Sequence, residues 1–91
     1  MKIEGVIIKE CGIREGQSEN GSWKLAEYVL QTEERFPHRM CFKVMDGRDG
    51  RIARLDLHVG KRVAVNFDID AREYNGSWFN TITAWDARPL D

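Results

Sequence analysis

The chain has 91 residues, 42% of them hydrophobic and 32% charged, which excludes a disordered chain and predicts one compact domain over residues 1–91. The formal net charge is −1 and no apolar run approaches the roughly 20 residues that span a bilayer, so neither a strongly basic clamp nor a membrane protein is expected. A charged start at Met1–Gly5 and only two cysteines predict a reduced, cytoplasmic protein.

The first half of the chain alternates apolar and polar residues, which predicts β-structure. Strands are expected over residues 2–13, 23–32 and 38–45, with a polar loop over residues 14–22. In the second strand Tyr28 and Leu30 share one face. In the third strand Arg39 and Lys43 lie on a basic, partly exposed face.

The second half begins with a turn-rich link at residues 46–50, after which residues 51–57 are predicted to form one or two helical turns. Ile52 and Leu55 should then face inward. The last two strands are expected over residues 63–72 and 78–87. The first of these two has a dry face composed of Val63, Val65, Phe67, Ile69 and Ala71.

The tetrapeptide Asn-Gly-Ser-Trp occurs twice, at residues 20–23 and 75–78, each time between two expected strands. Asn-Gly tolerates the positive φ angles of tight hairpin turns, so both copies are predicted to be turns. Trp23 and Trp78 would then lie beside loop tips, where small β-barrels stack nucleobases. The same tryptophans could instead pack at the ends of a core or at a subunit interface.

Three strands, a short helical segment and two more strands predict an all-β fold, the five-stranded Greek-key OB-fold barrel with its helical segment between strands three and four. An SH3-like barrel is the main competitor, but it usually lacks that helical segment.

Four segments resemble small bacterial OB-fold proteins related to single-stranded-DNA-binding protein and to the primosomal replication protein, a group with uncharacterised short members. They are Gly21-Ser22-Trp23, Glu27-Tyr28-Val29-Leu30, Val59-Gly60-Lys61-Arg62-Val63-Ala64-Val65 and Gly76-Ser77-Trp78-Phe79, together with Pro37. The resemblance implies non-catalytic binding of single-stranded DNA across the second and third strands and their flanking loops. The flexible acidic tail of the familiar single-stranded-DNA-binding proteins is absent at residues 87–91, so partner recruitment by that route is not expected.

The residues that bind nucleic acid are predicted from their charge and their aromatic rings. Residues 35–62 carry a local charge of +5, a field that can guide a phosphate backbone if these side chains share a surface. The residues predicted to bind nucleic acid are Trp23, Arg39, Lys43, Arg72, Tyr74 and Trp78. Arg39 and Lys43 share one strand face, and Arg72 and Tyr74 share another if no bulge intervenes.

No catalytic residue, metal site or cofactor is predicted. His38 and Cys41 fall on opposite faces of one expected strand, and Asp68 and Asp70 are expected on the solvent-exposed face of another strand. The expected partner is single-stranded DNA, or RNA, bound by a homodimer or higher oligomer, with replication proteins as further candidates. The alternative function is an assembly barrel of a replication complex, whose aromatics pair subunits and which has no nucleic-acid affinity of its own.

Overall fold

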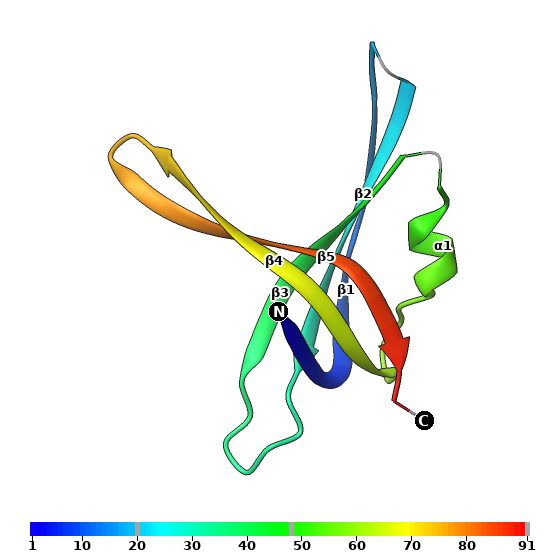
Figure 1. Cartoon of the computed structure of the whole chain (residues 1–91), viewed down its shortest axis with the longest axis vertical. Helices are drawn as coiled ribbons and strands as arrows, with labels where there is room; N and C mark the ends of the chain where they lie inside the picture. The colour runs from blue at the N-terminus through cyan, green and yellow to red at the C-terminus, as the bar shows by residue number, and fades with distance from the viewer. Residues whose placement is uncertain (20, 48, 91) are drawn as a thin grey trace.

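The computed structural model describes residues 1–19, 21–47 and 49–90 and consists mostly of strands (Figure 1). Its elements are β1 (Lys2–Ser18), β2 (Gly21–Gln31), β3 (Arg39–Asp46), α1 (Arg51–Leu55), β4 (Arg62–Tyr74) and β5 (Ser77–Pro89). The five predicted strands and the short helix are therefore all present, in the predicted order. Within the described residues, no helix is both long enough and apolar enough to span a membrane.

The strands close into a barrel in the order β1-β2-β3-β5-β4, with β4 paired to β1. Neighbouring strands are antiparallel except β3 and β5, which run parallel and pair only at Lys43 with Thr83 and at Val44 with Ala84. This Greek-key order, with the helix inserted between β3 and β4, is that of the OB-fold. The fold predicted from the order of elements is confirmed.

Strand alternation places one face of each strand inside the barrel. Tyr28 and Leu30 share one face of β2, as predicted, and the structure buries both; the centroid of the Tyr28 ring lies 5.8 Å from that of Phe42. Helix α1 adds buried Leu55 and partly buried Ile52, which confirms its predicted inward face. The buried hydrophobic residues are Ile7, Ala26, Tyr28, Leu30, Met40, Phe42, Val44, Leu55, Leu57, Val63, Val65, Phe67, Ala84 and Ala87.

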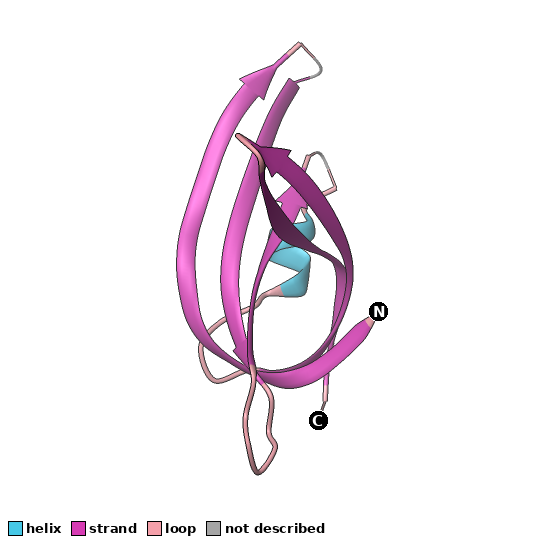
Figure 2. Cartoon of the chain, turned by 90° about the vertical axis from the view of Figure 1, so that its left-hand side faces the viewer, coloured by secondary structure: helices cyan, strands magenta, loops and turns pink. Residues whose placement is uncertain are grey.

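Two hairpins continue past the closed barrel and diverge, β1–β2 in blue to cyan and β4–β5 in yellow to orange (Figure 1). We call them the first arm (residues 14–19 and 21–25) and the second arm (residues 68–82). Figures 1 and 2 show the β2–β3 loop, residues 32–38, at the opposite end of the barrel from both arms.

The first arm overturns the polar loop predicted over residues 14–22. Arg14 pairs with Leu25 and Ser18 pairs with Gly21, so nearly all of that segment is strand. Outside the barrel an arm has little core to face, and polar residues can occupy either side of its strands. Apolar alternation therefore stops while the strand continues.

The predicted apolar face of β4 is buried along only part of its length, because the strand continues into the second arm. Val63, Val65 and Phe67 are buried as expected, but Ile69 and Ala71 are exposed. Past Phe67 the strand leaves the barrel and pairs with β5 alone. The apolar face of β4 is therefore buried only where β4 belongs to the barrel.

The two Asn-Gly-Ser-Trp copies occupy different positions in their hairpins. In the second copy Tyr74 pairs with Ser77, and Asn75 and Gly76 form the two-residue turn with φ of 50° and 81°, as predicted for Asn-Gly. In the first copy Gly21 already pairs with Ser18, so it is a strand residue and not a central turn residue. The turn predicted at Asn20 lies outside the described residues.

Helix α1 is tied to β3 by the buried Asp46. Its Oδ2 accepts a hydrogen bond of 2.8 Å from the backbone N–H of Ile52. That bond is the main reason that the pKa of Asp46 lies below its ordinary value. At the other end, the Lys61 ammonium donates to the carbonyls of Leu55 and Asp56, which satisfies the last turn of the helix.

Candidate functional site

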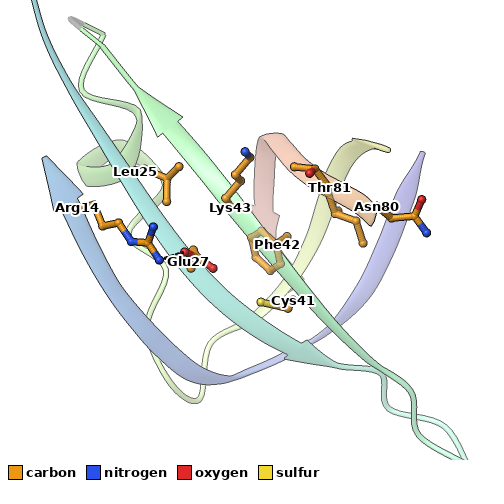
Figure 3. A pocket seen from close by; sticks show the side chains of 9 residues that line it. Arg14, Leu25, Glu27, Cys41, Phe42, Lys43, Asn80 and Thr81 are labelled. Atoms are coloured by element: carbon orange, nitrogen blue, oxygen red, sulfur yellow. Dashed lines mark ion pairs between the residues drawn. The ribbon is translucent and has the colours of Figure 1, made fainter. Parts of the chain in front are cut away.

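A groove of about 360 Å³ lies on the outer surface of the barrel, at the fork where the second arm separates from β3 (Figure 3). It is lined by Arg14 of β1, Leu25 and Glu27 of β2, Cys41, Phe42 and Lys43 of β3, and Asn80, Thr81 and Ile82 of β5. Polar side chains stand beside apolar ones in this lining. Such a mixture suits a ligand that has flat apolar faces and polar edges.

The charges of the groove are only partly neutralised. The Arg14 guanidinium lies 3.4 Å from Oε1 of Glu27, an ion pair drawn as a dashed line in Figure 3. Lys43 is directly opposite Glu27 in the β2–β3 register, yet it forms no ion pair with a described residue. Farther along the same face Arg39 donates a hydrogen bond of 3.2 Å to Gln31. Arg39 and Lys43 therefore share the outer face of β3, as predicted.

Trp23 lies on the first arm, on the same face of β2 as Leu25 and Glu27. Its indole covers Gly16, the residue paired with it on β1, so closely that a β-carbon at Gly16 would overlap the ring. A hollow of about 400 Å³ surrounds this pair of residues. The glycine thus lets the indole lie flat along the arm, half-buried and with surface left for contact.

The second arm is exposed on both faces from Asp68 to Asn80. Trp78, which is 67% exposed, shares its face with Asn80 and Ile82 of the groove and continues the interior side of the barrel. Arg72 and Tyr74 share the opposite face, as predicted, because no bulge interrupts this part of β4. Sequence reasoning grouped all three as binding residues, but Trp78 lies on the other side of the hairpin from Arg72 and Tyr74.

The basic segment over residues 35–62 does not form one surface. Arg51 pairs with Asp49 at 3.3 Å, Arg62 pairs with Glu33 at 2.7 Å, and Lys61 caps the helix. Arg35 lies over the ring of Phe36 in the β2–β3 loop, and Arg48 is outside the described residues. Arg54 lies in the last turn of α1. Among the described cations of this segment, Arg39 and Lys43 lie on the face of the groove, where Arg14 joins them from a different part of the chain.

The two cysteines are free and exposed. Partial burial raises the pKa of the Cys41 thiol above its ordinary value, and the neighbouring Cys11 thiol adds to that shift. A raised pKa keeps Cys41 protonated at neutral pH and makes it a poor nucleophile. Among the residues that the structure describes, no three His, Cys, Asp or Glu side chains gather as metal ligands.

Sequence reasoning missed three contributors to this region. Arg14 was placed in a loop, although the pairing of β1 with β2 sets it on the groove. Asn80 lines the groove from the base of the second arm, and Phe79, 58% exposed, lies beside Arg72. The available signal was the length of the β4–β5 segment, whose strands run well beyond what a small barrel closes over.

A closed five-stranded Greek-key barrel with a helix before β4 and a mixed groove on its outer face defines an OB-fold protein. The chain belongs to the family described as "Domain of unknown function (DUF3127)", which matches residues 2–88. No curated protein matches the chain.

Solved structures of the same fold confirm the resemblance to small single-stranded-DNA-binding and primosomal proteins. The chain is similar to the mitochondrial single-stranded DNA binding protein Rim1 from S. cerevisiae, with 18% identity and a TM-score of 0.71 over 99% of this chain and 92% of that one. The N-terminal domain of PriB from Thermoanaerobacter tencongensis, solved as a dimer, has 15% identity and a TM-score of 0.69 over 100% and 94%. A small single-stranded DNA-binding protein from Streptomyces coelicolor has 15% identity and a TM-score of 0.55 over 98% and 91%.

Proposed function

We propose that this protein binds single-stranded DNA without catalysis and with little overall sequence preference. The observation that carries the proposal is the presence of half-buried Trp23, exposed Trp78 and several cationic side chains around the groove. Trp23 and Trp78 come from the two arms, while Arg14, Arg39 and Lys43 lie on the strands that carry it. Single strands are bound in this way, by stacking of bases on aromatic rings and by cations along the backbone.

The expected energies of base stacking and phosphate contacts are large enough for useful affinity. Each stacked base contributes about 1–3 kcal/mol, and stacking tolerates any base because all have a π-face. Lys43 forms no ion pair with a described residue, so a phosphate can approach it without first displacing a carboxylate. The net charge of −1 limits long-range attraction, so the binding should depend on these local contacts.

The test is a titration of intrinsic tryptophan fluorescence with a single strand of mixed sequence and about 15 nucleotides, at low and at higher salt. We expect saturable quenching that weakens as the salt concentration rises, because binding releases counterions from the strand and this release is less favourable at higher salt. A duplex of the same length is the control and should quench much less. Absence of binding in both this titration and a mobility-shift assay would contradict the proposal.

Substitutions test whether the tryptophans of the two arms contribute to single-strand binding. Trp23→Ala and Trp78→Ala should each weaken binding by about 1–3 kcal/mol, which is roughly 5- to 150-fold in Kd. Phe36→Ala is the matched control, because Phe36 is an exposed aromatic of the β2–β3 loop, and this loop lies at the opposite end of the barrel from the arms (Figure 1). If Phe36→Ala weakens binding as much as the tryptophan variants, the placement of the interface is wrong.

We also propose that the chain works as a homodimer or higher oligomer in bacterial DNA replication, in the cytoplasm. Tyr74 and Phe79 lie exposed on the side of the second arm away from Trp78, and single-strand contacts do not need both sides. A domain of this size also gains from burying further apolar area. Sedimentation velocity over a range of concentrations tests this state, and a monomer at every concentration would contradict it. Repeating the fluorescence titration with RNA of the same sequence tests whether RNA is bound as well.

A further inference from the structure

We propose that Glu27, paired with Arg14 in the groove, accepts a hydrogen bond from the exocyclic amino group of a bound base, so that this position favours cytosine over uracil or thymine. The inference rests on the proposed binding of single strands and adds one base-selective position to it. The other contacts remain tolerant of sequence.

The starting observation is a carboxylate where a phosphate-binding groove does not need one. Glu27 lines the groove with Arg14 and stands opposite Lys43. A negative charge at this point repels a phosphate and weakens the attraction of both cations. As a structural ion pair it adds little, since a pair with an exposed partner contributes about 0–1 kcal/mol. Neither stability nor phosphate binding accounts for a carboxylate at this position.

The second observation is that the carboxylate retains unused hydrogen-bonding capacity. Only Oε1 is engaged, at 3.4 Å from Arg14, and no described residue donates a hydrogen bond to Oε2. The Glu27 side chain is 33% exposed, so it is partly desolvated but still reachable from the groove. A half-shielded acceptor of this kind forms stronger hydrogen bonds than a fully hydrated one.

The third observation is the match between this pair and one edge of a base. A carboxylate can only accept, and a guanidinium can only donate. Cytosine presents an amino donor at position 4 beside acceptors at N3 and O2, so it complements Glu27 and Arg14 together. With position 4 of the ring facing Glu27, uracil and thymine present a carbonyl oxygen, which the carboxylate repels, while their N3–H donor lies one position along the ring.

The groove also provides room and an apolar wall for the ring itself. Leu25, Phe42 and Ile82 contribute apolar lining beside the ion pair. The volume of about 360 Å³ lies at the lower end of the roughly 300–1,000 Å³ of small-molecule sites. One unstacked base fits such a space, and a duplex does not present its pairing edge to it.

The experiment compares oligodeoxycytidine with oligodeoxyuridine of about 15 nucleotides, because the two strands differ at position 4 of the ring and share their backbone. For the wild-type protein we expect a Kd about tenfold lower for the cytidine strand. In Glu27→Gln that ratio should fall to about one, since an amide can donate to a carbonyl as well as accept from an amine.

The control variant is Glu4→Gln, which removes one carboxylate from β1 but lies in a different hollow, with Thr32 and Glu33. It should keep the tenfold ratio. Arg14→Gln is the second test variant, because its side chain is 77% exposed and its loss should leave the fold intact while releasing Glu27. It should lower the ratio too.

Each outcome separates this inference from the proposed function. Equal affinity of the wild-type protein for both strands overturns the base preference and leaves single-strand binding in place. A Glu27→Gln variant that binds both strands more tightly but keeps the ratio also overturns it, because the carboxylate then acts only as a charge. Failure of both strands to bind contradicts the proposed function itself.

Discussion

The barrel and the second arm share strands β4 and β5, yet they use them in opposite ways. In the barrel β4 buries Val63, Val65 and Phe67. Every residue from Asp68 to Asn80 is exposed, although the backbone pairing continues without interruption over that stretch. One strand can therefore serve the core along half its length and a binding surface along the other half.

The difference between the barrel and the second arm follows from how much apolar area each buries. A barrel residue contributes to stability through the apolar area that it removes from water, and an arm residue buries little. The arm retains only its backbone hydrogen bonds, its turn and its cross-strand side-chain pairs. Substitutions should consequently affect stability in the barrel and binding in the arms.

The largest effect is expected when two phenylalanines of equal size are compared across this boundary. Phe42 is 2% exposed in the barrel, and Phe42→Ala should cost about 3–5 kcal/mol of the free energy of unfolding, through lost burial and a cavity. Phe79→Ala, on the arm, should change it by less than about 0.5 kcal/mol. Chemical denaturation monitored by circular dichroism measures both, and equal losses would refute the division into barrel and arm.

The next effect concerns the contact between Gly16 and Trp23 on the first arm. Gly16→Ala forces the indole to move, because the new β-carbon would overlap it. We expect a shifted tryptophan emission and a loss of about 1–2 kcal/mol in single-strand affinity, with a smaller change in stability. Gly47→Ala is the control, since its β-carbon meets no atom within 4 Å. Unchanged emission and affinity in Gly16→Ala would mean that this packing does not position Trp23.

A smaller effect is expected at the tip of the second arm. Gly76 has φ of 81°, and Gly76→Ala should cost about 1 kcal/mol because a side chain strains this conformation. Since the arm stands apart from the core, the cost should appear as faster amide hydrogen exchange in residues 70–80 and not in the barrel. Ser77→Ala, one residue along, should leave that exchange unchanged. Faster exchange throughout the barrel would show that the arm supports the fold.

The smallest effect is expected at Asp46, which belongs to the barrel end. Its pKa is lowered in the folded state, so its stabilising contribution is complete above the unfolded value and is lost as the pH falls through the folded value. Asp46→Asn can still accept the hydrogen bond from Ile52 but cannot titrate. The melting temperature of the variant should therefore fall less steeply than that of the wild type between about pH 5 and pH 2. Parallel curves would show that Asp46 does not contribute to acid sensitivity.

The sequence predicted the barrel better than the arms, for a reason visible in single residues. Alternation identified Val63, Val65 and Phe67 as inward-facing because the barrel has an inside. Along residues 14–18 no such pattern exists, and the strand was read as a loop. Pairing partners distant in the chain decide its conformation there.

The binding surface was predictable in its residue types and not in its grouping. Arg39 and Lys43 share a face because they are four residues apart on one strand, an even spacing that the sequence contains. The neighbourhood of Arg14 and Lys43 depends on the closure of β1, β2 and β3 into one sheet, which spacing does not contain. Strand binding by Trp78 is a prediction of the proposed function, whereas strand binding by Arg72 and Tyr74, on the other side of the second arm, stays a prediction from the sequence.

The two copies of Asn-Gly-Ser-Trp differ in the residue at which strand pairing begins. Because Ser22 follows a paired Gly21 whereas Ser77 is itself the first paired residue, the two tryptophans emerge on opposite sides of their hairpins. The position of the tryptophan relative to the first paired residue therefore decides which side of the hairpin its ring occupies, although both copies consist of the same four amino acids.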